Sequence, residues 1–191
     1  MTRGERVCTF IERYVLVPEG KHVGKPIKLM EFQRKFITDI YDNPKGTSRA
    51  YLSVARKNGK SALIAAILLA HIVGPEARQN SQIVSGARSR DQASLVFKLA
   101  EKMVRLSPGL SKIIKVVPSS KMLIGLPMNV EYKAISAEAG TAHGLSPVLA
   151  IAISTQAATD GDLFSIWLDD AMNAKDKRIV CHLYSAPEDC E

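Results

Sequence analysis

Apolar side chains recur at helical spacing near the start of the chain. Over residues 2–17 they fall on one helical face, and Thr2 and Glu5 have the spacing of a capping box. A second stripe of the same period runs through residues 30–41. Proline and glycine residues follow both segments. The pattern therefore predicts two amphipathic helices, Thr2–Val17 and Met30–Tyr41.

Beyond residue 47, short apolar runs alternate with longer helical patterns. Strand, glycine-containing loop, helix, strand and helix follow one another up to Pro108, which is typical of βαβ units. The sequence therefore predicts an α/β fold with a mostly parallel sheet flanked by helices. The predicted strands are Ala50–Val54, Gln82–Ser85, Ile114–Val117, Met122–Leu126, Val130–Ile135, Val148–Ser154 (interpreted as buried) and Arg178–Tyr184. The predicted helices are Ser61–Val73, a segment from Ser89 to Pro108, and Asp160–Asn173.

Length and composition favour one domain with a hydrophobic core. The chain has 191 residues, of which 46% are hydrophobic. We expect residues 1–46 to form a helical segment and residues 47–191 an α/β core. Three cysteines without a C-x-x-C pair argue against a disulfide framework or a zinc site and fit a reducing compartment. The longest apolar run, Ala62–Ala70, is too short to cross a bilayer, so we expect a soluble intracellular protein without a membrane partner.

Charge is distributed unevenly along the chain. Residues 1–134 contain 23 Lys and Arg against 10 Asp and Glu, whereas residues 135–191 contain 3 against 9. The net charge of +7 therefore combines a basic body with an acidic C-terminal region. A basic face attracts the phosphates of a nucleotide or of a nucleic acid. A merely solvated surface has the same composition, so charge alone leaves both interpretations open.

One segment, Ser53–Ser61, carries the residues of a phosphate-binding loop between a predicted strand and a predicted helix. Backbone N–H groups near Gly59 would face phosphate oxygens, and the start of the following helix adds its positive dipole end. Lys60 would neutralise β- and γ-phosphate charge, and the Ser61 hydroxyl would be a ligand for Mg²⁺. Val54 replaces the first glycine of the common pattern. The alternative is a basic turn between strand and helix.

Two more cations, Arg56 and Lys57, precede Asn58 and the glycine of this loop. An arginine placed against a γ-phosphate stabilises transition-state charge and can contribute roughly 10³–10⁵ in rate. Arg56 and Lys60 are therefore candidate catalytic residues. Lys57 and Asn58 complete the candidate nucleotide-binding loop, although solvation is the favoured interpretation for the Lys57 side chain.

Several motifs besides the loop recur in one protein family. They are Phe10-Ile11-Glu12 with Val17-Pro18-Glu19-Gly20, Leu29-Met30-Glu31-Phe32-Gln33, Ser85-Gly86-Ala87, His143-Gly144-Leu145-Ser146-Pro147 and Ser154-Thr155-Gln156. Together with the arginine-containing loop that lacks the first glycine, they resemble the ATPase half of terminase large subunits of HK97-like tailed phages.

The resemblance implies a P-loop NTPase-like fold that uses ATP and Mg²⁺. In the family's adenine motif, Gln33 would hydrogen-bond the base edge, and in its coupling motif Thr155 would sense the γ-phosphate. The resemblance further implies a motor that packages double-stranded DNA in the cytoplasm of a bacterial host. Its implied partners are the terminase small subunit, the portal and further copies of the same chain in a ring.

The sequence departs from the family in two ways. The family's nuclease domain has no counterpart in these 191 residues, so no DNA cleavage is expected. The apolar run that should end in the Walker B carboxylates continues directly into Ser154-Thr155-Gln156. A strand–helix unit on the order of 30 residues is therefore expected to be missing. Asp169 and Asp170, on a predicted helix, and Glu138, in a predicted loop, are weak substitutes.

The missing carboxylates change the expected chemistry. Positioned general-base action contributes roughly 10²–10⁴ in rate, whereas phosphate binding by Lys60 and the loop backbone does not depend on it. We therefore expect a protein that binds nucleotide and hydrolyses it poorly. Two alternatives stay open, a non-enzymatic basic module that binds DNA or packaging partners, and a decayed prophage remnant.

Overall fold

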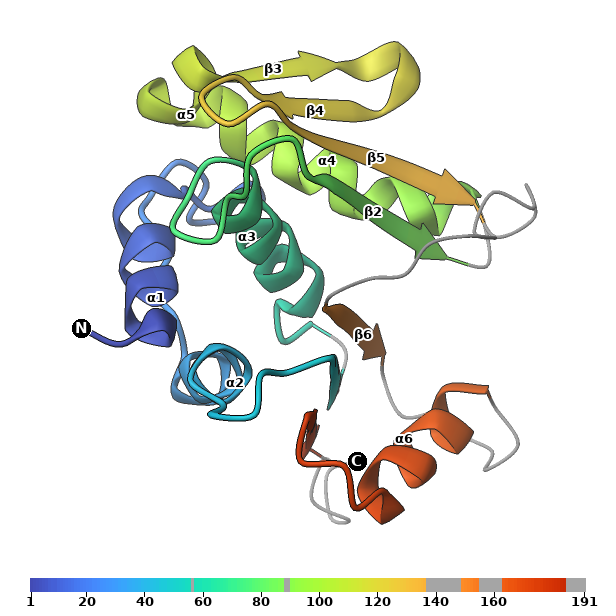
Figure 1. Ribbon diagram of the computed structural model, residues 1–191. Coiled ribbons are helices and arrows are strands. Elements are labelled where there is room, and N and C mark those ends of the chain that lie inside the picture. The colour runs from blue at the N-terminus through green and yellow to red at the C-terminus, as the bar shows by residue number, and fades with distance from the viewer. Residues whose placement is uncertain (56, 88–89, 137–148, 155–162, 185–191) are drawn as a thin grey trace. The chain divides into compact units, whose positions relative to one another are not determined.

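The computed structural model describes residues 1–55, 57–87, 90–136, 149–154 and 163–184 of the chain (Figure 1). Two compact units alternate along the sequence. The mixed-sheet unit comprises Met1–Met30 and Ser61–Leu145, and the parallel-sheet unit comprises Glu31–Lys60 and Ser146–Glu191. Each unit is described by itself below, and the prediction of a single domain stays a prediction.

The mixed-sheet unit begins with helix α1, Arg3–Tyr14. Thr2 and Glu5 form the predicted capping box, with the Thr2 hydroxyl and the Glu5 carboxylate each accepting from the other residue's backbone N–H. The helix ends three residues earlier than predicted because Val15 is already extended and Leu16 forms an isolated bridge with Pro26.

A four-stranded sheet and two further helices complete this unit. The strand order is β2-β5-β4-β3, in which β2 and β5 are parallel and the other pairs are antiparallel. Helix α4 packs against β2, β4 and β5 (Figure 1). Leu123, Tyr132 and Met103 are at most 1% exposed. The elements are β2 Gln82–Ala87, α4 Arg90–Leu106, α5 Pro108–Ile113, β3 Ile114–Val117, the 3₁₀ turn Pro118–Ser120, β4 Met122–Gly125 and β5 Val130–Ser136.

The parallel-sheet unit contains a three-stranded sheet of order β6-β1-β7, in which β1 is parallel to both neighbours. Tyr51 of β1 lies opposite Ala152 and Cys181, and Leu168 and Ala171 of α6 cover it. Helix α2 packs against β7. The elements are α2 Glu31–Tyr41, β1 Arg49–Val54, β6 Ala150–Ser154, α6 Leu163–Asn173 and β7 Ile179–Tyr184.

Helix α3, Lys60–Ile72, begins with the last residue of the parallel-sheet unit and continues into the mixed-sheet unit. Among the described residues, no helix is long and apolar enough to cross a membrane.

The α/β prediction is confirmed, because three of the five strand pairings in the described part of the chain are parallel and helices flank the sheets. One detail of it is wrong. Residues 148–154 were expected to form a buried strand, yet every residue of β6 is partly exposed. The reason is its position, since β6 is an edge strand among the described residues and β1 is its one neighbour.

Candidate functional site

The loop after β1 has the backbone conformation of a tight turn into a helix. Lys57 and Gly59 have φ values of 67° and 70°, in the left-handed region. Glycine adopts this region freely, whereas lysine does so at a cost. Turns with left-handed residues direct successive backbone N–H groups towards a common point, where an anion can be bound. Arg56 lies outside the described residues.

Lys60 folds back over the start of the loop. Its Nζ atom donates to the carbonyl oxygens of Val54 at 3.2 Å and of Ala55 at 3.5 Å. The Asn58 side chain also donates to the Ala55 carbonyl, at 3.2 Å. The ammonium group therefore stays beside the loop backbone, from which it can move to a phosphate oxygen without a rearrangement of the chain.

The start of α3 is suited to an anion. Lys60 is its first residue and Ser61 its second, and its first turn contains no acidic residue. The first backbone N–H groups of a helix lack partners within the helix and carry partial positive charge. A cation, a hydroxyl group and these N–H groups therefore follow one another along the chain.

Helix α2 brings Gln33 to the same loop. Gln33 is 6% exposed, and its Nε2 atom lies 3.6 Å from the point that a Cβ atom on Gly59 would occupy. The structure thus unites Gln33 with the loop, 26 positions later in the sequence. Thr155 lies outside the described residues, so its predicted role stays a prediction.

A hydrogen-bonded network that the sequence did not indicate lies between α2 and β7. Asp39 Oδ2 lies 2.7 Å from Lys35 Nζ and 2.9 Å from His182 Nε2, and His182 Nδ1 lies 3.0 Å from the Tyr184 hydroxyl. Burial alone would raise the pKa of the Asp39 carboxyl, but the hydrogen bonds from Lys35 and His182 outweigh it and leave that pKa below its usual value. The carboxylate therefore stays charged and keeps both partners.

The remaining acidic candidates do not assemble into a site. Asp169 and Asp170 lie on helix α6, as the sequence predicts, and both are exposed. Glu138 lies outside the described residues. Within the described ranges, no three His, Cys, Asp or Glu side chains are placed to share a metal ion.

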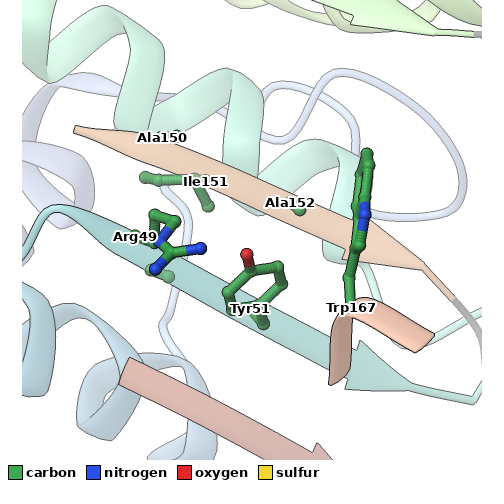
Figure 2. Close-up of a pocket in the computed structure, with 7 residues that line it drawn as sticks. Arg49, Tyr51, Ala150, Ile151, Ala152 and Trp167 are labelled. Carbon is green, nitrogen blue, oxygen red and sulfur yellow. The ribbon is translucent and has the colours of Figure 1, made fainter. Parts of the chain in front are cut away.

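A cavity of about 340 Å³ opens on the sheet of the parallel-sheet unit (Figure 2). Arg49, Tyr51 and Trp167 line it together with Ala150, Ile151 and Ala152 of β6. It lies at the first half of β1, whereas the loop follows the last residue of that strand. The cavity is therefore separate from the candidate nucleotide site.

Comparison with known proteins assigns the chain to a family. Residues 31–186 match the family model described as terminase large subunit, ATPase domain. The terminase large subunit of Enterobacteria phage HK97 is 56% identical over 222 residues, which cover all of this chain and 44% of the relative. The crystal structure of the HK97 bacteriophage large terminase has a TM-score of 0.89 at 55% identity, with 100% of this chain and 46% of that chain covered.

Two facts follow from the lengths. The chain spans about half the length of the relative that it matches. An alignment over 222 residues also exceeds the 191 residues of this chain by 31, so at least 31 positions of the alignment hold no residue of it. This number agrees in size with the strand–helix unit that the sequence predicts to be missing. The match over residues 31–186 and the identity over the whole chain show that this protein belongs to the family of terminase large subunit ATPase domains.

Proposed function

We propose that this chain binds ATP with Mg²⁺ at the loop Val54–Ser61, as the ATPase domain of a phage DNA-packaging terminase, and that it hydrolyses ATP poorly. The observation that carries the proposal is the position of Lys60, whose ammonium lies over the carbonyl groups of a glycine-containing turn that opens a helix. This arrangement fits a phosphate chain, because cation, helix start and turn N–H groups all attract anionic oxygens.

Each candidate site residue has a proposed role, which is the one that the sequence predicts. Lys60 would bind β- and γ-phosphate oxygens, and Lys57, Asn58 and Gly59 would contribute their backbone N–H groups. Gln33 would contact the base from α2. Two roles rest on the family resemblance alone, charge stabilisation by Arg56 and γ-phosphate sensing by Thr155.

Mg²⁺ would be held by Ser61, phosphate oxygens and water. Mg²⁺ commonly takes one or two carboxylates in addition, and Asp169 and Asp170 lie exposed on a helix instead. Together with the 31 unmatched alignment positions, this supports loss of the Walker B carboxylates. A water molecule would then lack the group that prepares it for attack, and we expect turnover to fall by roughly 10²–10⁴.

The partners proposed for the chain are those implied by its family. They are double-stranded DNA, the terminase small subunit, the portal and further copies of the chain, in the cytoplasm of a bacterial host. Double-stranded DNA is the partner with support in this sequence, because residues 1–134 carry an excess of 13 positive charges. Binding through such a surface would weaken steeply as salt rises.

The test of nucleotide binding is the thermal unfolding midpoint with and without saturating Mg-ATP. Ligand at about 100 times its dissociation constant stabilises the folded state by roughly 2.7 kcal/mol, which raises the midpoint by roughly 5–10 °C for a chain of this size. Lys60→Ala should abolish the shift, because it removes the cation that faces the phosphates.

Lys45→Ala is the matched control. It removes an exposed cation of the same unit, from the turn before β1, and should keep the full shift. A wild-type chain that melts cooperatively with no shift would contradict the nucleotide site and favour the DNA-binding alternative. Rapid release of phosphate by the wild type, lost in Lys60→Ala, would contradict poor hydrolysis while leaving the site intact.

A further inference from the structure

The end of β7 carries an aromatic side chain beside the candidate phosphate loop. Tyr184 is the last residue of β7 and is paired with Val54, the last residue of β1, after which the loop begins. The rings of Tyr184 and Phe32 are 5.3 Å apart at an angle of 59°. Both side chains are partly exposed, so they offer aromatic surface to a planar group from solution.

The first turn of α2 connects this aromatic surface to the loop. Phe32 and Gln33 are consecutive, and the Gln33 amide lies against Gly59. An aromatic pair, an amide and an anion-binding turn therefore adjoin one another within the parallel-sheet unit. A purine linked to a phosphate chain presents a matching order of groups, since it has a flat ring with hydrogen-bonding edges at one end and anionic oxygens at the other.

A chain of two hydrogen bonds connects the Tyr184 hydroxyl to Asp39 through His182. When His182 donates through Nε2 to the Asp39 carboxylate at 2.9 Å, its Nδ1 can accept the Tyr184 hydroxyl at 3.0 Å. The imidazole is only 8% exposed, and the ring of Phe36 packs edge-on against it at 5.3 Å. His182 is thereby fixed in one orientation, and through it the Tyr184 hydroxyl.

We propose that Tyr184 adds an aromatic wall for the purine base beside the family's adenine motif, to which Phe32 belongs, and that His182 and Asp39 are positioning residues that hold Tyr184 in place. The inference rests on the proposed function and adds a residue of β7 to the residues that would recognise the base. Packing of α2 on β7 would need only an apolar side chain at position 182. A histidine there leaves two buried nitrogens that require partners, and one of those partners is the aromatic residue beside the loop.

The test compares Mg-ATP with Mg-tripolyphosphate, which has the phosphates but no base, by isothermal titration calorimetry. Tyr184→Leu should weaken ATP binding by about tenfold, because it removes the ring on which the base stacks. Tripolyphosphate affinity should change by less than about twofold. Tyr184→Phe keeps the ring and should stay within about threefold of the wild type for both ligands.

The positioning role is tested by a double-mutant cycle. His182→Leu should weaken ATP binding by about threefold in the wild-type background, without an effect on tripolyphosphate. In the Tyr184→Phe background, where no hydroxyl remains to be held, the same substitution should have no further effect. A purely structural role of His182 would give equal losses in the two backgrounds, which would overturn the assignment. If circular dichroism shows that Tyr184→Leu does not fold, this cycle alone decides whether the inference holds.

The outcomes separate this inference from the proposed function. Unchanged ATP affinity in a folded Tyr184→Leu variant, or equal losses for the two ligands, would overturn the aromatic wall while the phosphate site stands. If the wild type binds neither ligand, the proposed nucleotide site is itself wrong and the inference fails with it.

Discussion

The mixed-sheet unit and the parallel-sheet unit differ in what lies over their sheets. In the mixed-sheet unit, Val130 and Tyr132 of β5 and Leu123 of β4 are at most 1% exposed. In the parallel-sheet unit, no residue of β6 is buried, and a cavity of about 340 Å³ lies over β1 and β6. Parallel strands are normally covered on both faces, yet both units have an edge strand without a buried residue among those whose exposure is described, β6 here and β2 in the mixed-sheet unit. The difference between the units is therefore the cavity.

The candidate functional residues lie in one of the two units. The loop from Val54 to Lys60, Gln33 and the His182 network all belong to the unit that contains the cavity. The predicted missing strand–helix unit would join the chain at β6, an edge strand among the described residues. Loss of that unit would therefore weaken the parallel-sheet unit first. Trp167, the single tryptophan, lies in this unit and gives it its own fluorescence signal.

The largest expected effect concerns Tyr132 in the mixed-sheet core. Its hydroxyl lies 2.7 Å from Ser85 Oγ, and burial raises the pKa of Tyr132 from 10.0 to about 12. The neutral phenol is favoured in the folded state, so this stability is fully present below pH 10 and is lost as the pH rises towards 12. The loss should reach roughly 3 kcal/mol.

Urea unfolding followed by circular dichroism between pH 9 and pH 12 would measure it. Tyr132→Phe has no proton to lose, so its stability should decline less over this range, although it starts lower because Ser85 loses its partner. Equal declines for the two proteins would show that Tyr132 is less deeply buried than the mixed-sheet core requires.

A second prediction tests close backbone packing in the same unit. A Cβ atom at Gly125 would overlap the carbonyl oxygen of Ile72 and would lie 2.8 Å from the Cγ2 atom of Ile72 and 3.1 Å from Cγ1 of Val73. Because backbone atoms cannot move as a side chain can, Gly125→Ala should destabilise the unit by about 1–3 kcal/mol.

The control for this substitution is Gly109→Ala in α5, where an added Cβ meets nothing within 4 Å. It should be neutral or slightly stabilising, because alanine favours helix more than glycine does. Thermal unfolding by circular dichroism compares the two variants. Equal midpoints would mean that β4 can move away from the end of α3, and the contrast between the units would then be weaker.

The features that the sequence predicted are those determined by neighbouring residues. The capping box depends on Thr2 and Glu5 alone, and the turn into α3 depends on the glycine before Lys60. The strand β6 was also predicted, because a short apolar run is typical of a buried strand. The exposure of β6 was not predicted, because it depends on which other segments pack against the strand.

The features that were missed depend on contacts between distant residues. The Asp39–His182 contact joins residues 143 positions apart, and it exists because β7 pairs with β1 and α2 packs against β7. Spacing along the sequence gives no rule that pairs His182 with a single carboxylate on a distant helix. A carboxylate and a tyrosine at the expected ends of α2 and β7 were the available signal.

The smallest expected effect concerns Ser53 in the parallel-sheet unit. Ser53 is 1% exposed, and its hydroxyl has no hydrogen-bond partner among the described residues. A buried hydroxyl without a partner is destabilising, so Ser53→Ala should raise stability by roughly 1 kcal/mol. The Trp167 fluorescence midpoint in urea reports this unit. Ser48→Ala is the comparison, because Ser48 precedes β1 and its hydroxyl has a partner, the Arg178 carbonyl. A gain would mean that the unit bearing the candidate site retains an unfavourable polar group next to the loop. A loss would mean that the hydroxyl is satisfied in the working molecule, and the parallel-sheet unit would then be better packed than its cavity and exposed edge strand suggest.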